Sequence, residues 1–247
     1  MRRNPVSISN GPGGWYSRET SLEDLAGRVS VAMITMNEQG AIGKVISDIR
    51  SAVPDAEIVI VDSSEDRTPE IAEELGARVI RQFPPTGYGP AMDLVLRSAS
   101  REVIVTMDCD DTYPAADIPR LASMVLVDGW DLVDGSRLQH KPAAMPWINF
   151  FANWGFALLA SILFARRITD LHSGMRAYRQ AMIGQLGHRP QGAALPVELL
   201  LIAFRRGFRV TSVYIPYRER VGVSTMRPWN SAKWTLKRIL YARFAAI

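Results

Sequence analysis

Cysteine is nearly absent from this sequence of 247 residues. The single cysteine, Cys109, excludes an internal disulfide and fits a reducing cytosol. The histidines and the cysteine show no zinc-finger spacing, and no basic and aromatic pattern resembles an RNA- or DNA-binding module. We therefore expect no nucleic-acid partner.

Glycine-rich phosphate loops are missing as well. No Gly-x-Gly-x-x-Gly follows the first predicted strand, and no Gly-x-x-x-x-Gly-Lys-Ser/Thr occurs in the chain. These absences argue against a dinucleotide-binding fold and against a P-loop. A phosphate ligand would have to be held by a metal ion or by arginines, and the sequence can supply both kinds of site.

Long apolar runs are also scarce. The longest covers residues 154–165 and predicts either a buried helix or an interfacial segment, too short to span a bilayer. The first residues are polar and lack the apolar core of a secretory signal. We expect a cytoplasmic protein that is soluble or peripheral at the inner face of the membrane.

The overall composition is that of a folded, mildly basic protein. Hydrophobic residues make up 47% of the chain, which is enough for a core. Lys and Arg number 29 against 25 Asp and Glu, and this surplus favours phosphate-bearing ligands or an anionic membrane surface. We divide the chain into a flexible segment at 1–27, one domain at 28–226 and a basic amphipathic helix at 227–247. That helix suits either packing on the core or lying at a membrane surface.

Strands and helices alternate along the first half of the chain. Runs rich in β-branched residues predict strands at 28–35, 57–61, 77–80, 103–106 and 130–135. Apolar residues and helix-end signals predict helices at 40–52, 70–75, 91–100 and 117–127. Further helices are expected at 149–165, 196–206 and 231–246, with a strand at 210–217. This alternation predicts an α/β fold with a mostly parallel central sheet flanked by helices.

Three carboxylates, Asp108, Asp110 and Asp111, closely follow the strand at 103–106. A buried strand cannot hold unpaired charges, so they must lie beyond its carboxyl end, where open α/β sheets bind ligands. Asp108 and Asp110 can point the same way from an extended backbone and together suit Mg²⁺ or Mn²⁺. The alternative is a solvated acidic turn before Pro114.

Short motifs in a fixed order resemble family 2 glycosyltransferases of the GT-A fold. They are Asn37-Glu38 after the first strand, Val61-Asp62 at the end of the second, and Asp108-x-Asp110 with Tyr113-Pro114. A narrower resemblance to polyprenyl-phosphate (dolichyl-phosphate) sugar transferases rests on Gly135-Ser136-Arg137, Asp170 with residues 173–179, and residues 217–220 with Gly222 and Ser224. The resemblance spans about residues 28–226 and implies a nucleotide-sugar-binding fold of the GT-A type.

The resemblance implies an inverting, metal-dependent transfer of a hexosyl or N-acetylhexosaminyl group from a UDP- or GDP-linked donor to polyprenyl phosphate. It implies donor binding by Thr35, Asn37, Glu38, Asp62 and Asp108. The metal would lie on Asp108 and Asp110, and the implied catalytic residues are Asp110, Arg137 and Arg220. Gly87 lies in a glycine- and proline-rich loop that either serves backbone geometry or closes over the donor.

These residue types fit the expected chemistry. A departing nucleoside diphosphate gathers negative charge, which a metal ion and arginines can stabilise. A phosphate acceptor is already an anionic nucleophile and needs positioning rather than a general base. A hydroxyl acceptor would need such a base.

Two cations that are usual in this branch of the family are missing. Thr225 and Met226 follow Ser224, where lysine is common, and no arginine stands shortly before Asn153. A second hypothesis therefore stays open: transfer to a hydroxyl of a soluble sugar, nucleoside or metabolite, with Glu198 as the catalytic base. Glu198 could instead cap its helix or pair with an arginine. A third hypothesis is a non-catalytic module that binds sugar nucleotides. The sequence predicts no oligomeric state.

Overall fold

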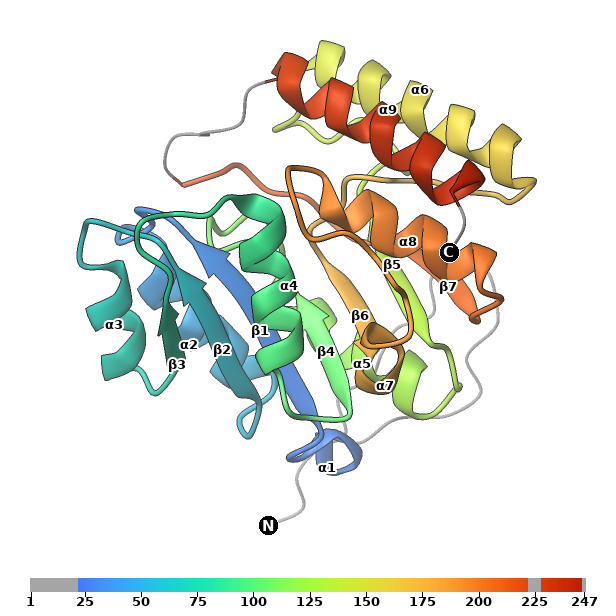
Figure 1. Ribbon diagram of the computed structural model, residues 1–247. Coiled ribbons are helices and arrows are strands. Elements are labelled where there is room, and N and C mark those ends of the chain that lie inside the picture. The colour runs from blue at the N-terminus through green and yellow to red at the C-terminus, as the bar shows by residue number, and fades with distance from the viewer. Residues whose placement is uncertain (1–21, 222–227, 246–247) are drawn as a thin grey trace.

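The computed structural model describes residues 22–221 and 228–245, with a seven-stranded sheet between layers of helices (Figure 1). The strand order is β3-β2-β1-β4-β6-β5-β7. The strands are β1 (Val29–Thr35), β2 (Glu57–Asp62), β3 (Arg78–Arg81), β4 (Val103–Thr106), β5 (Leu132–Ser136), β6 (Arg176–Arg179) and β7 (Val210–Tyr214). The helices are α1 (Leu22–Leu25), α2 (Ile42–Ala52), α3 (Thr68–Glu74), α4 (Tyr88–Ser98), α5 (Ile118–Leu126), α6 (Trp147–Phe164), α7 (Gln180–Ile183), α8 (Leu195–Arg205) and α9 (Pro228–Phe244). The predicted alternation up to β5 is confirmed, with ends shifted by a few residues.

β1 and β4 form the middle of the sheet. All four residues of β4 and nearly all of β1 are buried, because helices cover both faces. Strands buried on both faces are continuously apolar, which explains the valine- and isoleucine-rich runs. α1, α2, α3 and α5 pack on one face, while α4 and α8 pack on the other. Since β1 is parallel to both β2 and β4, the carboxyl ends of these three strands lie at one edge.

β6 is the strand that the sequence pattern did not reveal. The sequence predicts a polar, donor-rich segment there, yet Arg176–Arg179 run antiparallel between β4 and β5. The side chain of Arg176 is fully buried and donates to Asp134 on β5 at 2.6 Å. The strand register sets these two residues opposite each other, so that each charge compensates the other. The sheet is therefore mixed, although mostly parallel.

α6 is longer and more exposed than the sequence predicts. It starts at Trp147, has 18 residues, and is long and apolar enough to cross a membrane by length and composition. Only 11% of its residues are buried. The run predicted to be too short to span is longer than expected, because the helix gains apolar residues at its start. The expected buried helix is wrong, because most of its side chains are at least partly exposed. The exposure is compatible with the other expectation, an interfacial segment, which stays a prediction. Its exposed large side chains are Trp147, Ile148, Phe151, Trp154, Leu158 and Ile162.

The two terminal helices both belong to the core. α9 lies beside α6 and packs on α8, where it buries Ile239 and Ala242 (Figure 1). Leu25 of α1 is buried against α5, so the ordered fold begins before residue 28. Residues 1–21 of the predicted flexible segment lie outside the described residues, as do the motif positions Gly222 and Ser224.

Candidate active site

The carboxyl ends of β1 and β2 are joined through their last residues. Thr35 and Asp62 pair in register, and the Thr35 hydroxyl donates to Asp62 at 2.5 Å. Asp62 is fully buried and accepts further bonds from the backbone N–H and hydroxyl of Ser64, at 3.1 and 2.6 Å. The guanidinium of Arg81 pairs with the same carboxylate. Thr35 and Asp62, two of the predicted donor-binding residues, thus lie at this edge and are fixed by neighbouring groups.

Asn37 and Glu38 connect the turn after β1 to the loop after β2. Asn37 has a left-handed backbone with φ 63°, which asparagine tolerates, and its side-chain oxygen accepts the N–H of Glu65 at 2.9 Å. The N–H of Glu38 donates to the Thr68 hydroxyl at 2.9 Å. Burial raises the pKa of the Glu38 carboxyl, while Arg220 at 3.6 Å opposes that rise. The Glu38 carboxylate therefore belongs to the same charged group as the acidic loop.

The loop after β4 is folded around the carboxylate of Asp110. One oxygen accepts the N–H and the hydroxyl of Thr112, at 3.1 and 2.6 Å. The other lies 2.8 Å from Nη2 of Arg220. The chain after β7 is held here because the N–H of Val221 donates to the Asp110 carbonyl and that of Arg218 to the Thr112 carbonyl, both at 2.9 Å. The structure thus brings together Asp110 and Arg220, which were both predicted to be catalytic.

Asp108 makes no side-chain hydrogen bond or ion pair within the part of the chain that the structure describes. It lies so close to Gly174 that a Cβ there would come within 2.7 Å of its oxygen. Burial, and next the charge of Asp110, raise the pKa of Asp108 to about 7. Arg137 and Arg220 lower this pKa but do not outweigh burial and the charge of Asp110, so the two acids fit a divalent cation, which prefers oxygen ligands.

The cation would need further ligands from outside these two carboxylates. Among residues 22–221 and 228–245, no group of three or more His, Cys, Asp or Glu side chains could hold a metal ion. Mg²⁺ usually keeps several waters and takes one or two carboxylates together with substrate phosphates. Asp108 and Asp110 therefore fit a site that a diphosphate completes.

Asp111, for which the sequence suggested no role, points to a different partner. Its backbone is left-handed, with φ 62°. Its carboxylate lies 2.9 Å from Nζ of Lys44 on α2 and 3.7 Å from the guanidinium of Arg218. Asp111 thus ties the acidic loop to α2.

Arg137, at the end of β5, is held by Asp170. Its Nε and Nη2 donate to the two Asp170 oxygens at 2.7 and 3.0 Å, and its guanidinium lies 5.2 Å from the ring centroid of Tyr217. Burial opposes ionisation of Asp170, but Arg137 outweighs it and keeps the pKa of Asp170 below its usual value. Nη1 of Arg137 has no acceptor among the described residues, so it is available to a phosphate.

Two tyrosines to which the sequence assigned no role support the site. The Tyr113 hydroxyl accepts the N–H of Gly174 at 2.8 Å and so fixes the glycine beside Asp108. The rings of Tyr113 and Tyr217 meet edge to face, with centroids 5.5 Å apart. The available signal was their place in the motifs at 113–114 and 217–220.

The remaining two predicted residues are engaged elsewhere. Glu198 is buried in α8, where it accepts the N–H of Arg189 at 2.6 Å and pairs with the guanidinium of Arg238 on α9. This arrangement favours the ion-pair alternative over the general-base one. Gly87 precedes α4 with φ 107°, a conformation that side chains rarely adopt, so backbone geometry accounts for this glycine.

Comparison with known proteins gives consistent matches. The family model described as Glycosyl transferase family 2 matches residues 30–187. A dolichyl-phosphate hexose transferase of Haloferax volcanii is 42% identical over 212 residues, which cover 85% of this chain and 90% of that protein. An undecaprenyl-phosphate mannosyltransferase of Micrococcus luteus is 27% identical over 216 residues, covering 81% and 87%.

A solved structure shows the same fold. Glucosyl-3-phosphoglycerate synthase from Mycobacterium tuberculosis, in complex with Mn²⁺, UDP and glucosyl-3-phosphoglycerate, superposes with a TM-score of 0.75. The match covers 93% of this chain and 86% of that one at 23% identity, a level that supports the fold alone. The predicted α/β fold of the GT-A type, with its mostly parallel sheet, is confirmed. Because the family model matches well over half of the sequence, this chain belongs to glycosyl transferase family 2.

Proposed function

We propose that this protein transfers a hexosyl or N-acetylhexosaminyl group from a UDP- or GDP-linked donor to polyprenyl phosphate, with inversion at the sugar carbon. The observation that carries the proposal is the pair of Asp108 and Asp110 at the carboxyl edge of the sheet. Asp108 has no side-chain partner among the described residues, and Asp110 contacts Arg220. Such a site can bind the diphosphate of a sugar nucleotide through a cation and an arginine.

The donor side of the site rests on fixed groups. Thr35, Asn37, Glu38 and Asp62 line the edge next to the acidic loop and are held by hydrogen bonds. Mg²⁺ or Mn²⁺ on Asp108 and Asp110, when bound, supplies positive charge for the leaving diphosphate. Arg220 adds a planar guanidinium whose Nε and Nη1 have no acceptor among the described residues, and can bind phosphate oxygens.

The acceptor assignment rests on different observations. The similar proteins named above include a dolichyl-phosphate hexose transferase and an undecaprenyl-phosphate mannosyltransferase. Arg137 is held rigidly by Asp170 and keeps Nη1 available, as positioning a phosphate nucleophile requires. Both oxygens of Glu198 are occupied, which counts against the hydroxyl acceptor that needs this base.

The exposed face of α6 supports a peripheral membrane contact for this reaction. Trp147, Phe151, Trp154 and Ile162 are each more than half exposed and lie on a helix with little burial. Exposed aromatic patches of this kind mark interaction surfaces, and aromatic rings favour the bilayer interface. We place the protein at the cytoplasmic face of a membrane, where a polyprenyl acceptor would lie.

The test is a transfer assay. The purified protein is incubated with polyprenyl phosphate in detergent, Mn²⁺ or Mg²⁺, and labelled UDP- and GDP-sugars. We expect label in the lipid extract with at least one donor, and no label after chelation of the metal. Label found solely on soluble hydroxyl compounds would contradict the lipid acceptor.

Two variants of the acidic loop provide a matched comparison. Asp108→Asn and Asp111→Asn each remove one carboxylate charge from neighbouring positions. We expect Asp108→Asn to lower kcat/KM by about 100-fold or more, since it removes charge from the diphosphate site. Asp111→Asn should stay within about fivefold, because Asp111 pairs with the exposed Lys44. Equal losses would count against the role of Asp108.

A further inference from the structure

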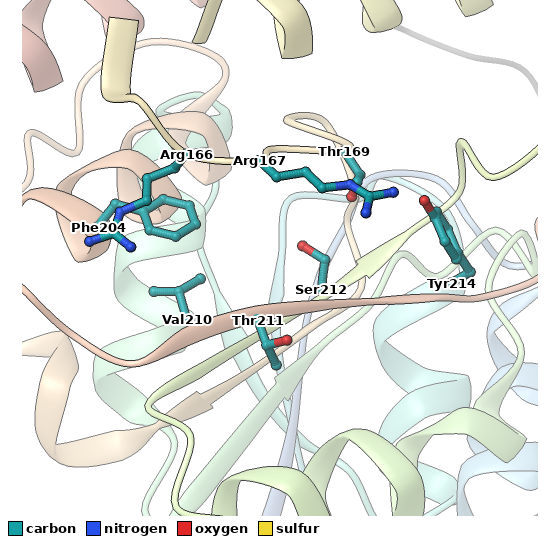
Figure 2. Close-up of a pocket in the computed structure, with 8 residues that line it drawn as sticks. All are labelled: Arg166, Arg167, Thr169, Phe204, Val210, Thr211, Ser212 and Tyr214. Atoms are coloured by element: carbon teal, nitrogen blue, oxygen red, sulfur yellow. The ribbon is translucent and has the colours of Figure 1, made fainter. Parts of the chain in front are cut away.

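A hollow of about 340 Å³ lies between the outer strand β7 and the chain that leaves α6 (Figure 2). Ligand sites for small molecules begin at about this volume. None of the residues that line it belongs to the acidic site, and none of them is Asp or Glu. The hollow is therefore a separate pocket whose charged groups are cations.

The two lining arginines are free to bind an anion. Arg166 and Arg167 are exposed, and neither side chain forms a hydrogen bond or ion pair within residues 22–221 and 228–245. Two nearby arginines do have acceptors: Arg205 donates to the carbonyl of Ala242 at 3.1 Å, and Arg243 donates to that of Leu163 at 2.9 Å. Arg205 and Arg243 thus stabilise helix ends, whereas the side chains of Arg166 and Arg167 make no such bond among the described residues.

Hydroxyl groups complete the polar side of the pocket. The Oγ1 of Thr169 is buried and has no hydrogen-bond partner among the described residues, which is costly unless a ligand or water supplies one. Figure 2 shows the guanidinium of Arg167 extending toward Thr169 and Tyr214, with Ser212 on the strand below. A guanidinium and hydroxyl donors that line the same pocket can together bind the oxygens of a phosphate group.

We propose that this pocket binds a phosphate group, supplied by the head group of an anionic phospholipid when α6 lies on a bilayer. Arg166 follows directly after the exposed apolar face of α6, so its charge lies where that helix would meet the head-group layer. The lipid source rests on the membrane contact proposed above. The phosphate site itself rests on the pocket alone.

Two variants test the site without relying on charge alone. Arg167→Gln removes one cation, and Thr169→Val removes one unpartnered hydroxyl at constant charge and nearly constant shape. Arg101→Gln is the matched control, since Arg101 is exposed outside the pocket. The probes are inorganic phosphate, followed by thermal shift, and phosphatidylcholine vesicles with and without phosphatidylglycerol, followed by co-sedimentation.

We expect inorganic phosphate to bind about tenfold more weakly to Arg167→Gln and Thr169→Val than to the wild type and Arg101→Gln. Phosphate bound by Arg137 or Arg220 would not respond to Thr169→Val. We expect both pocket variants to lose about fivefold in binding to the phosphatidylglycerol vesicles alone.

Each further outcome decides one part of the proposal. Weaker phosphate binding with unchanged vesicle binding would keep the phosphate site and overturn the lipid source. Unchanged binding of both probes would overturn the proposal. Neither measurement involves sugar transfer, so failure of the transfer assay would be seen separately.

Discussion

Arg220 bridges the acidic loop and the end of β1, because its guanidinium lies 2.8 Å from Asp110 and 3.6 Å from Glu38. One cation thus compensates two carboxylates that follow different strands, β1 and β4. The same side chain is 33% exposed, and its Nε and Nη1 have no acceptor among the described residues. It can therefore bind the leaving diphosphate while it keeps its contacts with Asp110 and Glu38.

Replacement of Arg220 should damage turnover more than stability. We expect Arg220→Gln to lower kcat by about 100-fold, as is typical when one group that stabilises transition-state charge is lost. Arg218→Gln removes the same charge two residues away, at 3.7 Å from Asp111, and should stay within about fivefold. Steady-state kinetics of both variants makes the comparison. Equal effects would mean that general charge, rather than the position of Arg220, matters.

Loss of Asp170 should destabilise the fold. Asp170→Ala would leave the nearly buried Arg137 without its bidentate partner, and breaking a buried pair costs about 3–5 kcal/mol. Asp48→Ala breaks the exposed pair with Lys44 and should cost about 0.5 kcal/mol or less. Urea denaturation gives both free energies of unfolding. A small loss for Asp170→Ala would show that Arg137 finds other acceptors or water.

Glu198→Gln separates a structural role from a catalytic one. Glu198 is buried and paired with Arg238, so its neutral replacement should lower the free energy of unfolding by about 3 kcal/mol. The turnover of the folded variant should stay close to wild type at a temperature where both are folded. Lost turnover with unchanged stability would instead support a general base and a hydroxyl acceptor.

His172 should make stability fall in mild acid. It lies in the segment between α6 and β6, where its Nε2 lies 2.7 Å from the Thr235 hydroxyl on α9. Burial lowers its pKa to about 4, and Arg137 and Arg176 act in the same direction against Asp170. Because the folded pKa is below the unfolded value of about 6.5, the unfolded state binds the proton first as the pH falls.

The stabilising effect of neutral His172 is thus complete above pH 6.5 and is lost between pH 6.5 and 4. At pH 5 the loss should be about 2 kcal/mol relative to pH 7.5. His172→Asn has no such titration, so the difference between the two proteins in urea denaturation should shrink as the pH falls. Parallel pH curves for wild type and variant would contradict this explanation.

Much of the fold was predictable because it depends on local patterns. The runs at 57–61 and 103–106 are β-branched, and both are buried strands. The helical spacing of Ile42, Val45, Ile46 and Ile49 marks the buried face of α2. The position of Asp108 and Asp110 after β4 placed them at the carboxyl edge, since a buried strand has no room for unpaired acids.

The site itself was predictable in part. Asn37, Asp62 and Asp110 each follow or end a strand, which identified them as edge residues. The contact between Arg220 and Asp110 could not be predicted from the spacing of residues in the sequence, because it depends on how the chain after β7 returns to the acidic loop. The sequence marked Asp170 as a motif residue but did not reveal its partner. The partner is Arg137, which the packing of β5 against the segment before β6 brings into contact with Asp170.

The sequence by itself determined the strands, most helices, the edge position of the acids and the resemblance that the family match then bore out. Only the tertiary structure decided that Arg176 lies in a central strand, that Glu198 pairs with Arg238, and that α6 is exposed. The physical reason is the separation along the sequence between the residues that interact. Helix and strand periodicity is written in neighbouring residues, whereas charge pairing and burial depend on which distant elements pack together.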